Sequence, residues 1–443
     1  MKSISTLIVV LISCFTAYSQ DTNNINDNIP AAELEKIMAK SIQYYGSINR
    51  ISQKQTTAMQ GSHVLFGWPL RTTAEYDDIP SYYMIQNYVD DNNDNLKIDY
   101  NCGNRTYDGH NGTDINIWPF WWDMMNKNYV QVVAAAPGII TSVVDNNGND
   151  HNCACMGNNN VISILHSDST TSIYYHIKDN SALVKEGDVV IQGQPIASVG
   201  SSGCSSNPHL HFEVRLLISN YAVLIDPWVR PDPATDCNDR NEDTYWQNQK
   251  PYWEPQVNRV LTHSANPVLT GYNNNSNFCA NGEFVNAKAN FIAGDQVFVG
   301  IAMHDYVSAT TVSYTIYNPN GTIFTNGTHT NNQTQNFNTW YLVFTHSLPL
   351  NAPSGTYKIM VSYFGIDYVS YFSVNCIANY TLTGNVNDKR GFIASNSIIS
   401  DAVLNTLSQV KMQAAGYIQF NPGFTATAGS TLKARIKDCN YSE

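Results

Sequence analysis

Two histidines separated by one residue give the clearest chemical signal in the chain. His209 and His211 lie in the run Pro208-His-Leu-His-Phe-Glu-Val-Arg215. On a β-strand, residues two apart point to the same face. Both imidazoles are therefore expected to project into one site, while the apolar alternate residues, Leu210 and Phe212, face a core. Two solvated histidines on a strand are the simpler alternative.

A second group places a histidine and a carboxylate four residues apart, in His110-Asn-Gly-Thr-Asp114. The two side chains can converge if the chain turns at Gly112, because glycine adopts conformations that other residues avoid. Zinc accepts mixed nitrogen and oxygen ligands of this kind. The spacing also occurs by chance, so this group by itself does not establish a site.

A third group lies in a short predicted strand that ends near Ile177. Alternation predicts that Tyr174 and His176 share one face of this strand and that Tyr175 lies on the other. The three groups together suit a catalytic zinc site, which has three protein ligands and a water. Such a metal acidifies the water and polarises a carbonyl, while nearby histidines transfer protons.

Several longer motifs occur around these groups in a fixed order: His110-Asn-Gly-Thr-Asp-Ile115, Val133-Ala-Ala-Ala-Pro-Gly-Ile-Ile140, Tyr175-His-Ile177, Val184 to Gly200 and Ser205 to Arg215. With these motifs, the segment from about 103 to 227 resembles the lysostaphin/LytM-type zinc endopeptidases, which cut peptide bonds in bacterial cell walls.

The resemblance implies a role for each matching residue and one Zn²⁺ per chain. His110, Asp114 and His211 would be the zinc ligands. His209 and His176 would be the catalytic pair that activates the water and stabilises the tetrahedral intermediate. Glu213 lies on the same strand face, and we expect it to orient a neighbour or form a salt bridge rather than act as a base.

Two inserts depart from the family pattern. The first, Trp118-Pro-Phe-Trp-Trp122, follows Asp114. It either forms a wall of a substrate groove, to which Trp118, Trp121, Trp122 and Tyr174 would contribute, or packs as core against an N-terminal helix. The second, Asp145 to Asn160, carries Cys153 and Cys155. In an exported protein these favour disulfides with Cys102 or Cys204 over metal binding.

The N-terminus predicts export from the cell. Lys2 precedes a short apolar run and small residues near Ser19, which is typical of a secretory signal peptide. Removing it takes Cys14, so nine cysteines become eight, and an even set favours disulfides. No later stretch is long and apolar enough for a membrane span. The formal net charge of -12 argues against nucleic-acid binding, because no basic face neutralises phosphates.

Pattern and composition divide the 443 residues into successive parts. Charged residues are only 14%, and Asn, Thr, Ser and Tyr are abundant, which favours a mainly β extracellular protein. We expect an antiparallel peptidase sheet, an immunoglobulin-like β-sandwich and a small stacked-β module. The predicted boundaries are a signal peptide at 1–19, a helical segment at 20–60, the peptidase domain at 61–230, a linker or ordered wrap at 231–256, the sandwich at 257–378 and the stacked module at 379–443.

The leading hypothesis is a zinc metalloendopeptidase that hydrolyses peptidoglycan stem peptides or cross-bridges. It would act outside the cell, in the periplasm or at the surface of a bacterium, with the later modules serving adhesion or targeting. One alternative is an exported zinc protease for Gly-rich proteins. Another is a catalytically inactive binding or scaffold protein, which should lack at least one ligand. The oligomeric state is not indicated.

Overall fold

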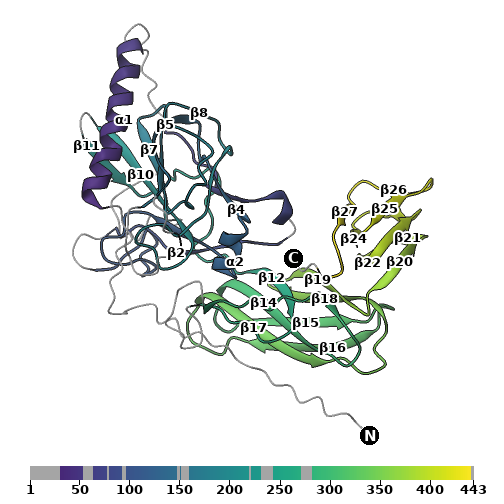
Figure 1. Cartoon of the computed structure of the whole chain (residues 1–443). Helices are drawn as coiled ribbons and strands as arrows, with labels where there is room; N and C mark the ends of the chain where they lie inside the picture. Colours follow the sequence, from purple (N-terminus) through teal and green to yellow (C-terminus); the bar gives the residue numbers. More distant parts are fainter. Residues whose placement is uncertain are drawn as a thin grey trace.

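The computed structural model describes residues 30–52, 63–76, 79–91, 96–146, 150, 159–218, 221–230, 243–270 and 282–440. The predicted signal peptide and the Cys153/Cys155 pair lie outside this part of the chain. The prediction of a mainly β protein with a short N-terminal helix is confirmed, and three β-rich parts follow one another along the chain (Figure 1).

The first part is built on one long antiparallel sheet with the strand order β2-β3-β10-β7-β6-β5-β8. Its strands are β2 (Tyr83–Asn87), β3 (Thr113–Ile117), β10 (His209–Ile218), β7 (Thr170–Tyr175), β6 (Val161–Leu165), β5 (Gly138–Val144) and β8 (Val189–Val190), with β11 (Tyr221–Ile225) paired to β10. A second antiparallel sheet comprises β1 (Leu70–Thr72), β4 (Val130–Val133) and β9 (Pro195–Ser198), and η1 (Ala74–Tyr76) is a short 3-10 helix.

Two α-helices, α1 (Ala31–Ser52) and α2 (Trp121–Asn126), accompany these sheets in the described residues. In α1, Ile37 and Met38 are buried against one face of the long sheet. The opposite face packs into a large core rich in aromatic side chains. Neither described helix is both long and apolar enough to cross a membrane.

The second part is a sandwich of two sheets. One sheet contains β12 (Gln256–His263), β14 (Gln296–Tyr306) and β17 (Phe337–Ser347). The other contains β13 (Asn290–Phe291), β19 (Ile366–Val374), β18 (Gly355–Tyr363), β15 (Thr311–Tyr317) and β16 (Ile323–Thr330). Alternating apolar residues from both sheets fill one core between them.

The third part stacks short strands in parallel. One sheet has the order β20 (Ile377–Leu382), β22 (Lys389–Ser400), β24 (Gln409–Ala414) and β27 (Thr431–Ile436), with β25 (Tyr417–Phe420) paired to β22. The other contains β21 (Asn385–Val386), β23 (Val403–Leu404) and β26 (Thr425–Ala426). A disulfide joins Cys376 to Cys439 across this module. Cys102 and Cys204 are also disulfide-bonded.

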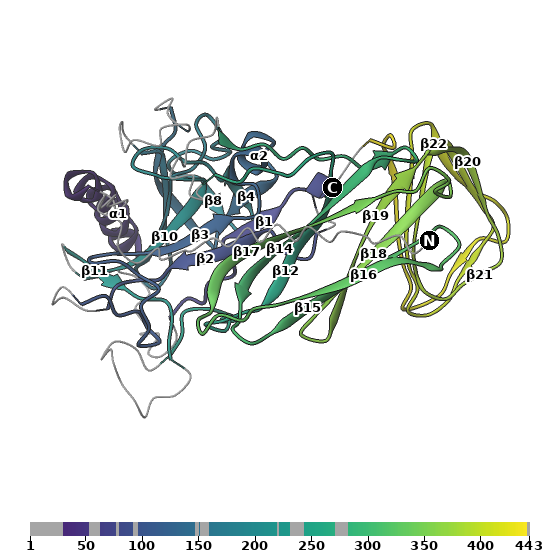
Figure 2. The ribbon, with the colours of Figure 1, turned by 90° about the horizontal axis from the view of Figure 1, so that it is seen from below.

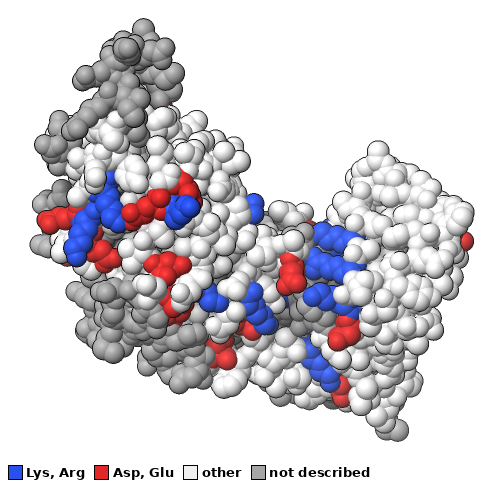
Figure 3. All heavy atoms as spheres, turned by 45° about the horizontal axis from the view of Figure 1, so that its top comes forward, with Lys and Arg blue, Asp and Glu red and all other residues white. Residues whose placement is uncertain are grey.

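A groove lies between the stacked module and the sandwich. Lys411, Lys433 and Arg435 line its module side, and Tyr371 lies on the sandwich side. Lys411 and Lys433 are directly opposite each other in neighbouring strands. Figure 3 shows cationic side chains gathered in the hollow where the C-terminal part meets the rest of the molecule.

The first part and the sandwich share one apolar core. Figure 2 shows the strands of the sandwich lying against β2 of the first part. Tyr341 of β17 is fully buried there, with its ring centroid 5.6 Å from that of Phe120. Arg105 and Asp305 form a buried ion pair of 3.2 Å across the same boundary. Trp246, from the segment predicted as a linker or ordered wrap, is buried in this core as well. Residues 243–256 are therefore an ordered wrap, and the sandwich is packed onto the first part.

Replacing Tyr341 by alanine tests this shared core. Truncating a large buried aromatic residue costs about 3–5 kcal/mol, because it removes transfer free energy and leaves a cavity. We expect Tyr341→Ala to lower the unfolding midpoint of the first part as well as that of the sandwich, measured by calorimetry. Tyr417→Ala, at a side chain that is 46% exposed, is the control and should change little. Loss of stability in the sandwich alone would contradict a shared core.

The boundary also predicts acid sensitivity. Burial by itself raises the pKa of Glu254, but hydrogen bonds with His304 and Tyr83 and the charge of Lys250 outweigh it and lower the pKa to about 2. A carboxylate whose pKa is lower in the folded state stabilises the fold above its unfolded pKa, here near 4.5, and loses that contribution as the pH falls towards 2. Between about pH 4.5 and pH 2, the melting temperature of Glu254→Gln should fall less steeply than that of wild type. An equally steep fall in both proteins would contradict the lowered pKa of Glu254.

Candidate metal centre

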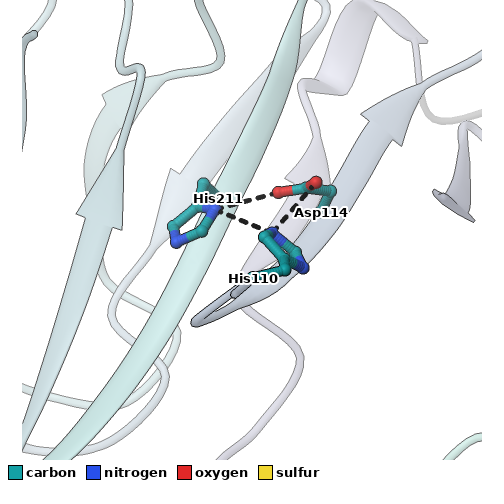
Figure 4. A group of neighbouring side chains, drawn as sticks. All are labelled: His110, Asp114 and His211. Atoms are coloured by element: carbon teal, nitrogen blue, oxygen red, sulfur yellow. Dashed lines mark hydrogen bonds and ion pairs between the residues drawn. The ribbon is translucent and has the colours of Figure 1, made fainter. Parts of the chain in front are cut away.

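Three strands of the long sheet bring the predicted metal ligands together. β10 lies between β3 and β7, and its register places His211 opposite Asp114 on one side and opposite Tyr175 on the other. His110 lies in the turn before β3. Figure 4 shows the three side chains, His110, Asp114 and His211, pointing towards one another from these elements. We call them the donor group.

The nitrogen and oxygen atoms of the donor group lie within contact of one another. His110 Nε2 is 3.1 Å from Asp114 Oδ2, His211 Nδ1 is 3.0 Å from Asp114 Oδ1, and the two nitrogens are 3.2 Å apart. Ligands about 2.0–2.1 Å from a tetrahedral zinc ion lie about 3.3 Å from one another. The donor group therefore has the spacing and chemistry to hold such an ion.

The far nitrogen of each imidazole in the donor group lies near an acceptor, and for His110 a hydrogen bond to that acceptor fixes the tautomer. His110 Nδ1 lies 2.6 Å from the carbonyl oxygen of Tyr88 and must donate to it, so Nε2 carries the lone pair. His211 Nε2 lies 3.5 Å from Glu213 Oε2, which leaves Nδ1 for the metal. Two nitrogen lone pairs that face each other repel unless a cation or a proton lies between them. This contact points to a bound cation.

The ionisation of the donor group also suits a metal ion. Burial raises the pKa of Asp114, but the charge and hydrogen bond of His110 and the hydrogen bond of His211 hold it well below its usual range. Burial lowers the pKa of His211, but hydrogen bonds to Asp114 and Glu213 raise it to about 10. Without a cation, His211 thus holds an extra proton, which metal binding replaces because only deprotonated imidazole is a ligand.

Glu213 is held as an anion behind His211. Burial raises its pKa, but the hydrogen bond from His211 and the charge of Arg215 lower it overall. Arg215 donates its Nε–H to Glu213 Oε1. Glu213 therefore contacts His211 on one side and Arg215 on the other, as expected for a residue that orients its neighbour.

Two glycines shape the turn that carries His110. The chain bends at Gly112, as the sequence predicts, and Gly109 has a positive φ of 77°. Gly112 also permits a close approach of the strands, because a Cβ there would lie 2.5 Å from His211 Nε2. A side chain at Gly112 would push β3 away from β10 and open the donor group.

His176 and His209 form a second pair beside the donor group, with ring centroids 4.7 Å apart. Each Nδ1 lies 2.7 Å from a backbone carbonyl oxygen, that of Ser202 for His176 and that of Asn207 for His209. Each Nδ1 therefore carries the hydrogen, and each Nε2 holds a lone pair. His209 Nε2 is 3.7 Å from Asp114 Oδ1, so this lone pair lies next to the donor group.

The protonation state of His176 suits a base. Burial holds its pKa well below the usual range, and the nearby charges of His209 and His211 lower it further. Among the described residues, its Nε2 has no hydrogen-bond partner. The neutral ring therefore presents an Nε2 lone pair to the site, which is the form that can accept a proton.

The predicted strand faces need one correction. His176 lies just beyond β7 with a φ of 59°, which breaks the alternation and turns its side chain towards His209 and His211. Tyr174 lies on the opposite face, fully buried, and its hydroxyl accepts a hydrogen bond from the Ala135 N–H. Tyr174 is therefore core and not a groove residue.

The Trp-rich insert is also core. Trp118, Trp121 and Trp122 are 0%, 5% and 1% exposed, so none can line an open groove in this structure. The Trp118 ring centroid lies 6.5 Å from that of Tyr341 in the sandwich. The insert packs against the sandwich, and α1 belongs to a separate cluster. The insert therefore does not line a groove, and it packs against the sandwich rather than against the N-terminal helix. Both sequence-based interpretations were wrong on this point.

One network beside the site was not predicted. Asn159 donates to the Tyr175 hydroxyl over 2.6 Å, and its Oδ1 accepts from the Cys204 N–H over 3.0 Å. These two hydrogen bonds hold the loop that contains Ser202, and the carbonyl oxygen of Ser202 orients His176. Glu33 of α1 accepts from the Tyr175 hydroxyl over 3.2 Å. No sequence pattern links these residues, because they are distant along the chain and act partly through backbone atoms.

Residues 109–227 match the model of peptidase family M23. The chain carries an M23 peptidase domain. Over 69 residues it is 42% identical to the murein hydrolase activator EnvC of Escherichia coli (strain K12), covering 16% of each protein. It is 45% identical over 62 residues to the murein hydrolase activator NlpD of the same organism, covering 14% of this chain and 16% of NlpD. The chain thus spans about one sixth of these relatives.

Among solved structures, the catalytic domain of lysostaphin from Staphylococcus simulans is similar at 26% sequence identity. The match covers 35% of this chain and 96% of that domain, with a TM-score of 0.21.

The geometry of the M23 domain predicts one divalent metal ion per chain. His110→Ala and His211→Ala should each lose it, because two remaining donors do not hold the ion at micromolar metal concentrations. His209→Ala and His176→Ala should retain it, since neither residue belongs to the donor group. Plasma mass spectrometry of purified protein measures the metal content, and circular dichroism confirms folding. A full equivalent of metal in His110→Ala would contradict the assignment.

Proposed function

We propose that the M23 domain is a zinc-dependent endopeptidase that hydrolyses peptide bonds of bacterial peptidoglycan. The observation that carries the proposal is the complete set of side chains in one buried place: the donor group, with His176 and His209 beside it. A domain kept only for binding would not need all five. Two histidines and one carboxylate fit a catalytic zinc, which keeps one position for water.

When bound, the zinc ion would polarise the scissile carbonyl and acidify a water molecule. The chain's own residues then move protons and stabilise charge. His209 Nε2, next to Asp114, is placed to accept the proton of the attacking water. His176 lies beside His209, with ring centroids 4.7 Å apart, and its neutral Nε2 offers a second acceptor for that proton. The carbonyls of Ser202 and Asn207 hold both rings in orientation.

The choice of peptidoglycan rests on the relatives and on the predicted compartment. EnvC and NlpD are both named as activators of murein hydrolases, which connects them with peptidoglycan. The disulfide-bonded Cys102, Cys204, Cys376 and Cys439 fit an oxidising compartment outside the cytoplasm. We propose that the protein acts in the periplasm, at the bacterial surface or after secretion. An exported zinc protease for Gly-rich proteins would use the same site.

A second candidate follows from the same relatives, whose names describe activators of murein hydrolases. An activator would bind a hydrolase and need no metal. The complete donor group favours catalysis, and a wall-digestion assay separates the two functions.

The catalytic pair gives the sharpest test. His209→Ala should keep one zinc ion and lose about 10²–10⁴-fold in kcat, because general base catalysis contributes that much. His176→Ala should lose a similar amount. His329→Ala, in β16 of the sandwich, is the matched control and should keep full activity. Release of peptides from purified walls, followed by mass spectrometry, measures the rate.

Two outcomes would overturn the proposal. Equal activity of wild type, His209→Ala and His211→Ala would show that this site does not carry out hydrolysis. Inactivity of the zinc-loaded wild type, together with stimulation of an added murein amidase, would establish the activator function. Digesting walls and a Gly-rich protein in parallel identifies the substrate.

A further inference from the structure

β2 is the end strand of the long sheet, and it pairs with β3, the strand that carries Asp114. The register of this pair shifts near the end of β2: Ile85 is opposite Ile115, but Asn87 is opposite Asp114. β2 therefore holds one extra residue, Gln86, and bulges there. With regular pairing, Gln86 would lie opposite Asp114. The bulge thus decides which side chain of β2 faces the metal ligand.

The bulge turns the carboxamide of Asn87 towards the donor group. Asn87 Nδ2 donates a hydrogen bond of 2.8 Å to Asp114 Oδ2. The two oxygens of this carboxylate are otherwise alike, because His110 Nε2 lies 3.1 Å from Oδ2 and His211 Nδ1 lies 3.0 Å from Oδ1. An oxygen that already accepts an N–H shares less of its electron density with a cation. Asp114 Oδ1 is therefore the better metal donor of the two.

The residues directly after Asn87 support a second metal ligand. The carbonyl oxygen of Tyr88 lies 2.6 Å from His110 Nδ1 and accepts its hydrogen. The backbone N–H of Asp90 donates to the carbonyl oxygen of His110 over 2.8 Å, and Asp90 Oδ2 accepts from the Gly109 N–H over 2.8 Å. The end of β2 and the residues that follow it thus position two of the three members of the donor group.

The outer side of β2 is held as well. Asn258 of β12 donates its Nδ2–H to the carbonyl oxygen of Tyr83 over 2.8 Å. Arg105, which pairs with Asp305 of the sandwich, donates to the carbonyl oxygen of Ile85. Because β2 is bound on both edges, the Asn87 amide is fixed in place before any metal binds. A partner of this kind orients a ligand and tunes its affinity for the ion.

We propose that Asn87 is a positioning residue of the metal centre. Its amide engages Asp114 Oδ2, so that the carboxylate presents Oδ1 alone to the ion and one coordination position stays available for water. The inference rests on the proposed function in taking zinc as the ion, and it deepens that function by assigning the residue that keeps the donor group open.

Zinc affinity tests the proposal without any hydrolysis. Asn87→Leu removes the N–H donor and nearly keeps the side-chain volume. We expect its zinc dissociation constant to rise about 10–100-fold, because losing a hydrogen bond to a metal ligand costs that much affinity. Competition with a chromogenic chelator measures the constant. Gln86→Leu is the matched control: it removes the neighbouring carboxamide, whose partner is Asn116, and should bind zinc as wild type does.

Cobalt in place of zinc reports how the carboxylate binds. Four-coordinate Co²⁺ absorbs visible light more strongly than five-coordinate Co²⁺, so the spectrum follows the number of ligands. Wild type and Gln86→Leu should give the strong absorption. Asn87→Leu should absorb more weakly, because both oxygens of Asp114 can then bind. A residue that only stabilised the fold would leave the spectrum of the folded protein unchanged.

Thermal unfolding of the metal-free chains checks that the variants fold, and Asn87→Ala, which adds no bulk, should give the same two changes as Asn87→Leu. Wild-type zinc affinity and an unchanged cobalt spectrum in both Asn87 variants would overturn the inference. Equal weakening by Gln86→Leu would also overturn it, since the effect would then come from a loosened β2. If the Asn87 variants change as expected but no zinc-loaded chain digests walls, the proposed function fails and the positioning role stands.

Discussion

The position of β10 between β3 and β7 is the constraint on which the metal centre depends. The strand contributes His209 and His211, and its register with β3 places Asp114 directly opposite His211. A slip of one residue would turn both histidines into the core and expose the apolar residues between them. The buried face of β10, with Leu210 and Phe212 packed into the main core, therefore fixes the site geometry through the hydrophobic effect.

Backbone carbonyl groups control the orientation and the tautomer of the histidines in the site. His110, His176 and His209 each donate Nδ1–H to a carbonyl oxygen, and each presents Nε2 towards the centre. Side chains alone would leave the tautomers undetermined. The loops that carry Tyr88, Ser202 and Asn207 thus belong to the site even though their side chains do not. The positive φ of His176 is a local strain that the surrounding structure maintains.

The donor group and the mainly β fold could be predicted from the sequence because both leave short-range signals. The alternation around His211 identifies a strand face, and the motif order identifies the peptidase family. The corrections concern contacts that have no local signal. Nothing near Trp118 indicates that Tyr341, more than two hundred residues later, packs beside it. The turn at His176 breaks the alternation that was used to place it. The pairing of Glu33 with Tyr175 is likewise a long-range contact.

The shared core of the M23 domain and the sandwich has a geometric consequence for the metal centre. Trp246 and Tyr341 leave no hinge between the two parts, and the backbone N–H of Ile393 in the stacked module donates to Thr356 Oγ1 of the sandwich. Direct contacts thus join the three parts in series. If the C-terminal end were to bind a surface, these contacts would set the distance between that surface and the metal centre.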